Sequence, residues 1–169
     1  MGAHLLVDGY NLALSGALPL SGDPTTEAGR QELCGQLADY ARKKGFRLTV
    51  IFDGRGAGRR ERSRTAFKGG TAHFSSASES ADDVIREMAR SAPAGTVVVT
   101  SDRGLAGTLP SRAVTVVSCA EFAGRLFDFG IETIKGTSED ETARHRAKTG
   151  EGHKAKKKDR KRESVLRKL

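Results

Sequence analysis

The chain has 169 residues, 37% of them hydrophobic, which is enough for one domain with a buried core. It contains no apolar run of the ~18–20 residues that a transmembrane helix needs. Its net charge of +8 is uneven, because residues 142–169 hold 12 of the 29 Lys and Arg residues and only 3 of the 21 Asp and Glu residues. The cysteines and histidines show no metal-ligand spacing and no disulfide framework, and the chain does not open on a secretion signal, so we expect a cytoplasmic protein with no membrane segment.

The first half of the chain predicts a βαβ unit. Residues 4–8 form a short apolar strand, and residues 9–11 are expected to turn the chain. A helix begins near Thr26, where apolar residues recur with helical spacing, and it ends at Gly45 after three cations in its last turn. A second strand over residues 48–53 follows. Because a strand, a crossover helix and a second strand form a right-handed unit, the two strands are expected to be parallel.

Residues 54–70 lack any periodicity and contain five glycines and six cations. A stretch of this kind is either a functional loop or disordered. It starts at the end of a predicted strand, beside Asp53, so we favour a clamp on a phosphate backbone over a plain surface loop. The cations expected to make this clamp are Arg55, Arg59, Arg60, Arg62, Arg64 and Lys68.

The second half of the chain alternates between strand and helix patterns. Strands are expected at residues 71–74, 96–101 and 114–117, and helices at residues 82–89, 103–109 and 120–129. Ser80 is a good N-cap for the first of these helices, with Asp83 three residues later as a variant of the capping box. This alternation predicts an open α/β fold with a mostly parallel sheet. Cys34 and Cys119 are expected to be buried thiols.

The basic tail over residues 142–169 predicts a partner that carries negative charge. Cationic segments attract polyanions, and nucleic acid is the usual one. Composition alone leaves open a solvated end with no specific partner. We expect the tail to be partly helical or disordered and to contact RNA through Lys154, Lys156, Lys157 and Lys158.

Five aspartates lie at the ends of predicted elements: three follow apolar runs, and two lie at the start of a helix. Asp8, Asp53 and Asp102 close predicted strands, and Asp82 and Asp83 open the helix after Ser80. Because parallel strands end at one edge of their sheet, we expect these carboxylates to gather there. Clustered carboxylates repel one another unless a hard cation lies among them. The pattern therefore indicates a Mg²⁺ or Mn²⁺ site of the kind that hydrolyses phosphodiesters.

Each of these polar residues also has an ordinary structural explanation. Asp8 and Asn11 can belong to a turn, and Asp53 precedes Gly54 in a common turn pair. Asp102 can be a helix N-cap, and a pair of acids at a helix start complements the helix dipole. Taken singly, structure and function are about equally good explanations. Their concurrence at one predicted edge favours function.

The segment from Leu5 to Leu12 strongly resembles the opening of the NYN domain family, PIN-like ribonucleases, and especially its bacterial YacP-like branch. Residues 50–54, 80–85 and 99–102 fit the later markers of that family in order and spacing. The resemblance implies a PIN-like three-layer α/β domain over residues 1–141, with helices flanking the central, mostly parallel sheet. It also implies metal-dependent endoribonuclease activity on single-stranded RNA, which some relatives perform on ribosome-bound messenger RNA.

The resemblance also assigns roles to individual positions. It implies that Asp8 and Asp82 are the primary metal carboxylates, that Asp102 is the third and that Asn11 is a polar helper, with these four forming the catalytic set. Asp53 and Asp83 are then supporting acids of the same metal site.

One departure from the family pattern keeps alternatives open. Many PIN-like domains carry a second acid two residues after the third carboxylate, and here that position is Gly104. A non-catalytic RNA- or ribosome-binding protein is therefore the alternative function. A phosphatase is the weakest candidate, because Tyr10 stands where such enzymes carry a second Asp.

Overall fold

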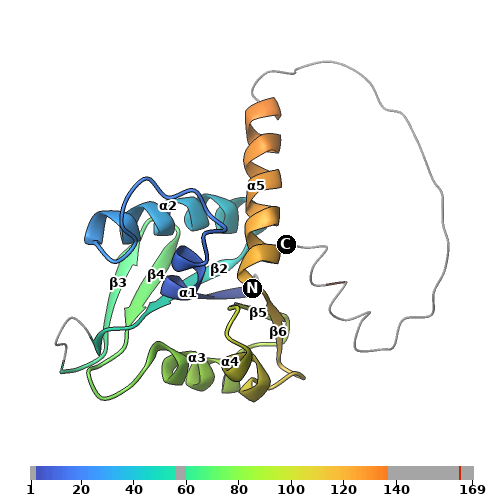
Figure 1. The fold of residues 1–169 in the computed structure, drawn as a ribbon. Helices are drawn as coiled ribbons and strands as arrows, with labels where there is room; N and C mark the ends of the chain where they lie inside the picture. The colour runs from blue at the N-terminus through green and yellow to red at the C-terminus, as the bar shows by residue number, and fades with distance from the viewer. Residues whose placement is uncertain (1–2, 56–59, 137–163, 165–169) are drawn as a thin grey trace.

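The computed structural model describes residues 3–55, 60–136 and 164, and its core is a six-stranded sheet (Figure 1). The strand order is β3-β4-β2-β1-β5-β6, and every neighbouring pair is parallel except β3 and β4. In chain order the strands are β1 (His4–Asp8), β2 (Arg47–Phe52), β3 (Ser63–Phe67), β4 (Gly70–Phe74), β5 (Thr96–Val99) and β6 (Val114–Val117).

Helices cover both faces of the sheet and complete a three-layer α/β fold, which confirms the predicted fold class. One layer holds α1 (Gly9–Leu14), α2 (Glu27–Lys44) and α5 (Cys119–Gly136), and the other holds α3 (Ala81–Arg90) and α4 (Arg103–Thr108). Among the described residues, no helix combines the length and apolar character needed to cross a bilayer.

Strand β1 lies in the middle of the sheet and is buried on both faces. Leu5 and Val7 belong to the core beneath α2 and α5, whereas Leu6 belongs to the core beneath α3. All three side chains are fully buried, as expected for a central parallel strand. The strand therefore delivers Asp8, its last residue, to a fixed position at the carboxyl edge of the sheet.

Two local predictions are wrong. Residues 63–67 do not belong to a loop, because they form β3 and pair antiparallel with β4 through a tight connection at Gly69, whose φ of 97° suits glycine. Polar residues dominate this edge strand, so it carries no apolar alternation. Residues 9–11 do not simply turn the chain, because Asp8 caps a short helix that begins at Gly9.

A capping box fixes the start of α3, as the sequence predicts. The Ser80 hydroxyl accepts a hydrogen bond from the Asp83 N–H at 3.2 Å, and the Asp83 carboxylate accepts one from the Ser80 N–H at 2.9 Å. These bonds satisfy donors that a helix start otherwise leaves unpaired. The box sets the direction in which Asp82, the next residue of the first turn, leaves the helix.

Gly54 locks the end of β2 against the end of β4. Its N–H donates to the Ser75 hydroxyl at 2.9 Å, and the Ser75 N–H donates to the Phe52 carbonyl at 3.0 Å. A Cβ atom at Gly54 would lie 2.0 Å from the Ser75 carbonyl oxygen, so only glycine fits. The contact holds Asp53 at the same edge as Asp8.

Replacing Gly54 with alanine should lower the free energy of unfolding by about 1–3 kcal/mol, because the backbone must move to relieve the overlap with Ser75. Chemical denaturation monitored by circular dichroism measures this change. Gly107→Ala is the matched control, since nothing lies within 4 Å of a Cβ atom at Gly107 in α4. Helix propensity predicts that the control gains about 0.5–1 kcal/mol. Equal stability of the two variants would contradict the proposed close contact at Gly54.

Candidate active site

Asp8 is the most deeply buried acid at the carboxyl edge of the sheet. Asp8 is only 6% exposed, and its carboxylate caps α1 by accepting a hydrogen bond from the Asn11 N–H at 3.3 Å. Asp8 therefore has a structural role as the N-cap of α1. However, one N–H bond leaves most of the hydrogen-bonding capacity of a carboxylate available for a further partner.

Thr100 links Asp8 to Asp102. The Thr100 hydroxyl donates to Asp8 Oδ2 at 3.3 Å and accepts the Asp102 N–H at 3.1 Å. Asp102 in turn caps α4 by accepting the Leu105 N–H at 2.8 Å. Two acids that are 94 positions apart in the sequence are thus tied to one buried hydroxyl, and Asp102 itself is exposed.

Asn11 is held in one orientation by two donors. Its Oδ1 atom accepts the Ser101 N–H at 2.7 Å and the Cys119 thiol at 3.1 Å. Ser101 also accepts the Cys119 N–H at 2.9 Å, so the three residues form a closed network. With the carbonyl oxygen engaged in this way, the amide group of Asn11 keeps its N–H donors for the neighbouring cavity.

Asp53 and Arg55 form an ion pair at the end of β2. The Arg55 guanidinium contacts both carboxylate oxygens of Asp53, with the shortest distance 2.9 Å, and the Arg55 N–H donates to the same group. Burial alone would raise the pKa of Asp53, but these bonds and the charge of Arg55 outweigh it and lower the pKa. Asp53 is therefore already neutralised by a cation of the chain itself.

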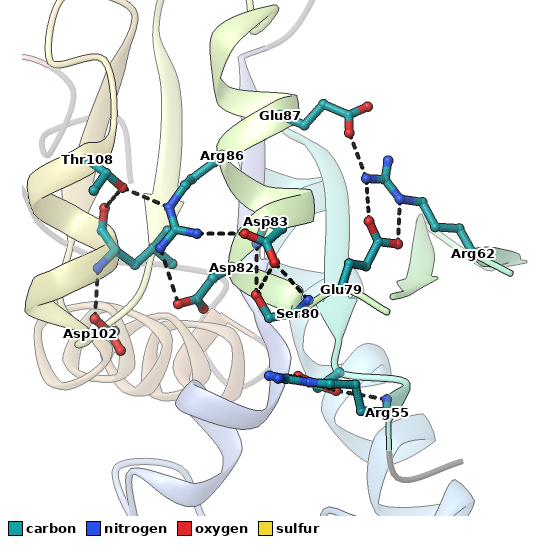
Figure 2. A network of polar contacts seen from close by, with 12 residues as sticks. Arg55, Arg62, Glu79, Ser80, Asp82, Asp83, Arg86, Glu87, Asp102 and Thr108 are labelled. Carbon is teal, nitrogen blue, oxygen red and sulfur yellow. Dashed lines mark hydrogen bonds and ion pairs between the residues drawn. The ribbon is translucent and has the colours of Figure 1, made fainter. Parts of the chain in front are cut away.

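Arg86 on α3 places its guanidinium between the carboxylates of Asp82 and Asp83 and also contacts α4 (Figure 2). Its guanidinium is 2.9 Å from Asp83 and 3.7 Å from Asp82, and it donates to the Thr108 hydroxyl at 3.0 Å. Asp83 is further engaged by the capping box at Ser80, and these bonds lower its pKa. Asp82 keeps the looser of the two contacts to Arg86.

These elements enclose a polar cavity of about 470 Å³. The structure brings Asp8, Asn11, Asp53, Asp82 and Asp102 together there, whereas Asp83 points to the capping box and does not line the cavity. The residues that line it are Asp8, Tyr10, Asn11, Leu14, Ser15, Asp53, Ala81, Asp82, Ser101 and Asp102.

Burial and the repulsion between neighbouring carboxylates raise pKa values in this cavity. Burial raises the pKa of Asp8 to about 6, and the charges of Asp82 and Asp102 add to the shift, while the hydrogen bonds from Asn11 and Thr100 oppose it. Burial also raises the pKa of Asp82, with a further contribution from Asp102 and with Arg86 opposing. The raised values mean that the folded protein holds these carboxylates in a place that disfavours negative charge.

A hard divalent cation suits this donor set. Within the described residues, no three His, Cys, Asp or Glu side chains are already grouped around one point that could hold a metal. The donors are nevertheless carboxylates, and the charges of Asp82 and Asp102 raise the pKa of Asp8 while the charge of Asp102 raises that of Asp82, which is a cost that a cation removes. Asp8, Asp82 and Asp102 would hold the ion, and Mg²⁺ commonly keeps several waters between itself and such ligands.

Arg62 serves as a structural ion pair in the segment predicted to clamp RNA. Its guanidinium lies 2.6 Å from Glu79 and 2.7 Å from Glu87, so it fastens the start of the β3 hairpin to α3 (Figure 2). Because Arg55 is also held in an ion pair, two of the six cations predicted to contact phosphate are already engaged within the protein.

The structure describes some of the remaining cations that were predicted to contact RNA and does not describe the others. Arg60, Arg64 and Lys68 are exposed on or beside the β3 hairpin. The other predicted RNA-binding residues lie outside the described residues: Arg59, Lys154, Lys156, Lys157 and Lys158.

Sequence reasoning did not single out Thr100, Ser101 or Tyr10, and it treated Cys119 only as a buried thiol. Thr100 and Ser101 directly precede Asp102 at a strand end, and that position could have drawn attention to them. No local signal shows that the Cys119 thiol meets Asn11, which lies 108 positions earlier.

Known proteins resemble this chain in sequence and in fold. A family model described as the YacP-like NYN domain matches residues 5–169. The chain is similar to the crystal structure of Rae1 (YacP) from Bacillus subtilis, with a TM-score of 0.54 and 25% identity, covering 80% of this chain and 83% of that one. A mutant of the same protein gives a TM-score of 0.54 and 24% identity, covering 79% and 84%. A search among curated proteins finds no match.

Replacing Asp8 with asparagine should stabilise the metal-free protein at pH 7.5 by up to about 2–3 kcal/mol. The pKa of Asp8 is about 6 in the folded state against 3.8 in the unfolded chain, so folding favours the protonated form. Wild type therefore loses stability as the pH rises from about 4 through 6, and the variant does not. Denaturation curves between pH 4 and 8 in the presence of a chelator measure the difference, which should vanish near pH 4.

Asp39→Asn is the control, because the Asp39 side chain is 66% exposed on α2 and lies outside the cavity. It should shift stability by only a few tenths of a kcal/mol at any of these pH values. Adding Mn²⁺ at pH 7.5 should raise the melting temperature of wild type and of the control but not that of Asp8→Asn. A difference between Asp8→Asn and wild type that is independent of pH would contradict the assignment of a raised pKa to Asp8.

Proposed function

This chain belongs to the YacP-like NYN domain family, and we propose that it is a divalent-metal-dependent endoribonuclease that cleaves single-stranded RNA. The family itself indicates a nuclease-like function related to RNA. The observation that carries the finer proposal is the cavity lined by Asp8, Asp82 and Asp102, in which the neighbouring carboxylates raise the pKa of the buried Asp8 and Asp102 raises that of Asp82.

The residues around the cavity divide the work. A bound Mg²⁺ or Mn²⁺ would supply a hydroxide from water and neutralise charge on the phosphate. Asp8 and Asp82 provide negative charge for the ion, with Thr100 fixing Asp8 in place. Asn11, oriented by Ser101 and Cys119, offers amide N–H donors to a phosphate oxygen.

Contacts outside the cavity must hold the RNA, because the cavity itself is acidic. We assign this role to Arg60, Arg64 and Lys68 on the β3 hairpin and to the basic tail over residues 142–169. Cations of this kind contact phosphates irrespective of sequence. We place the protein in the cytoplasm, where its two free cysteines would stay reduced and where ribosome-bound RNA is a candidate substrate.

A non-catalytic RNA- or ribosome-binding protein is the second candidate. It is favoured by the ion pairs that Arg55 and Arg86 make with the acids, and by Gly104 in place of a further carboxylate. Under this alternative, the acids serve as caps and salt-bridge partners, and the basic segments provide all of the binding.

Replacing Asp8 or Asp82 with asparagine should reduce cleavage of labelled single-stranded RNA about 100-fold or more, because a weakened metal site loses several kcal/mol of transition-state stabilisation. RNA binding should persist or tighten, since a negative charge is removed. Cleavage followed on gels with Mg²⁺, with Mn²⁺ and with chelator measures the effect.

The control variant Asp39→Asn also removes one carboxylate, and it should cleave the RNA at the rate of the wild type. Unchanged cleavage by Asp8→Asn would refute the role assigned to Asp8. RNA binding by wild type without turnover under any divalent cation would establish the non-catalytic alternative.

Removing residues 150–169 should weaken RNA binding and flatten its salt dependence, because each lost phosphate contact reduces the steepness of the fall of log K (the association constant) with log salt by about one. Fluorescence anisotropy at several salt concentrations measures both quantities. The melting temperature should change little. A loss of stability as large as that of a core mutation would show that the tail packs on the domain.

A further inference from the structure

A second cavity lies between α2 and the β3–β4 hairpin. It is a groove of about 530 Å³, a size suited to a small organic ligand. Its walls come from the first half of α2, the end of β2 and both strands of the hairpin. The residues that line it are Glu27, Arg30, Gln31, Cys34, Gly35, Phe52, Thr65, Ala66, Phe67, Lys68, Ala72 and Phe74.

Aromatic rings and cations together give this groove its character. Phe67 and Phe74 are half-buried and present part of their surface, and the Arg30 guanidinium lies over the Phe74 ring at 5.8 Å from its centre. Lys68 adds a second positive charge, against the single acid Glu27. A flat, π-rich ligand attached to an anion fits such a surface, because rings stack on it and cations attract the anion.

The groove is connected to the acidic cavity by direct contacts. The Tyr10 and Phe52 rings are 5.1 Å apart, and the Phe52 and Phe74 rings are 5.4 Å apart and stacked. Arg30 donates to the Tyr10 hydroxyl at 3.2 Å while it covers Phe74. Tyr10 lines the acidic cavity and Phe74 lines the groove, so one row of rings joins the two.

We propose that this groove binds an unpaired base of the RNA strand whose phosphate occupies the acidic cavity. The inference rests on the proposed function only in taking single-stranded RNA as the polymer, and it does not require that the RNA is cleaved. Stacking of a base on aromatic side chains tolerates any sequence, which suits a groove that presents the rings of Phe67 and Phe74.

Charge and position favour an RNA base over a peptide strand. A peptide that added to the edge of β3 would gain nothing from Arg30, whose guanidinium lies on the α2 side over Phe74. A nucleotide uses the ring surface, the cations and the path towards the acids at once. The same single-stranded RNA therefore accounts for both cavities.

Gly35 allows the groove to be filled without disturbing the fold. It is an exposed residue of α2, it lines the groove, and nothing lies within 4 Å of a Cβ atom placed there. Gly35→Leu should therefore fold normally while its side chain blocks the base. Gly124→Leu is the matched control, because Gly124 is an exposed glycine of α5, also with open space around it, that does not line the groove.

The test measures binding of a fluorescein-labelled seven-nucleotide oligoadenylate to the full chain by anisotropy, in chelator so that no cleavage occurs. Gly35→Leu should lower affinity about tenfold, and Gly124→Leu should match wild type. An abasic residue at one position of the probe should cost wild type a similar factor, and should cost Gly35→Leu nothing further. Circular dichroism and melting temperatures establish that both variants are folded.

Equal affinity of wild type and Gly35→Leu for the probe would overturn the proposal and leave the groove to a protein partner. Equal losses from the abasic residue in both proteins would also overturn it, because the base would then bind elsewhere. Both outcomes are separate from the proposed enzymatic activity, since RNA that binds in the groove but is not cleaved when metal is added would refute only that activity.

Discussion

Repulsion among carboxylates at one edge of the sheet is the constraint on which the rest of this structure depends. Strand β1 is buried on both faces, so it carries Asp8 into a place from which water is largely excluded. Asp82 and Asp102 approach from α3 and α4 and raise its pKa further. Two hydrogen bonds to Asp8 offset only part of this cost. A fold that keeps such a cluster gives up stability at neutral pH for an arrangement that suits a cation.

The chain limits this cost with its own cations. Arg55 neutralises Asp53, and Arg86 lies between Asp82 and Asp83 and ties α3 to α4. Asp8 has no ion pair among the described residues, since its partners are an N–H and a hydroxyl. The most buried acid is thus compensated by hydrogen bonds alone, and a cation that enters the cavity would relieve the unfavourable burial of its charge.

Local patterns in the sequence were enough to predict an open α/β fold with a mostly parallel sheet and the edge at which the main acids lie, whereas the three-layer arrangement was implied by the family resemblance. The apolar run before Asp8 and the β-branched run before Thr100 identify central strands, and strand ends must then meet at one edge. Strand β3 escaped prediction because an edge strand exposed to solvent needs no apolar alternation. Long-range pairings escaped it too: Arg62 reads as a phosphate contact until Glu79 and Glu87, 17 and 25 positions later, are seen to hold it.

If the protein acts on RNA as proposed, an acidic cavity beside a basic surface would separate the binding of RNA from its cleavage. A cluster of carboxylates repels a polyanion, so the affinity of the free protein for RNA must come from residues outside the cavity. Under the proposal, the exposed cations of the hairpin, the basic tail and the aromatic groove would provide it without contributing to the chemistry. A divalent ion held by Asp8, Asp82 and Asp102 would supply positive charge in the cavity, which would favour the binding of a phosphate there. Affinity and turnover in this protein are therefore expected to depend on different residues, joined physically through Tyr10 and Arg30.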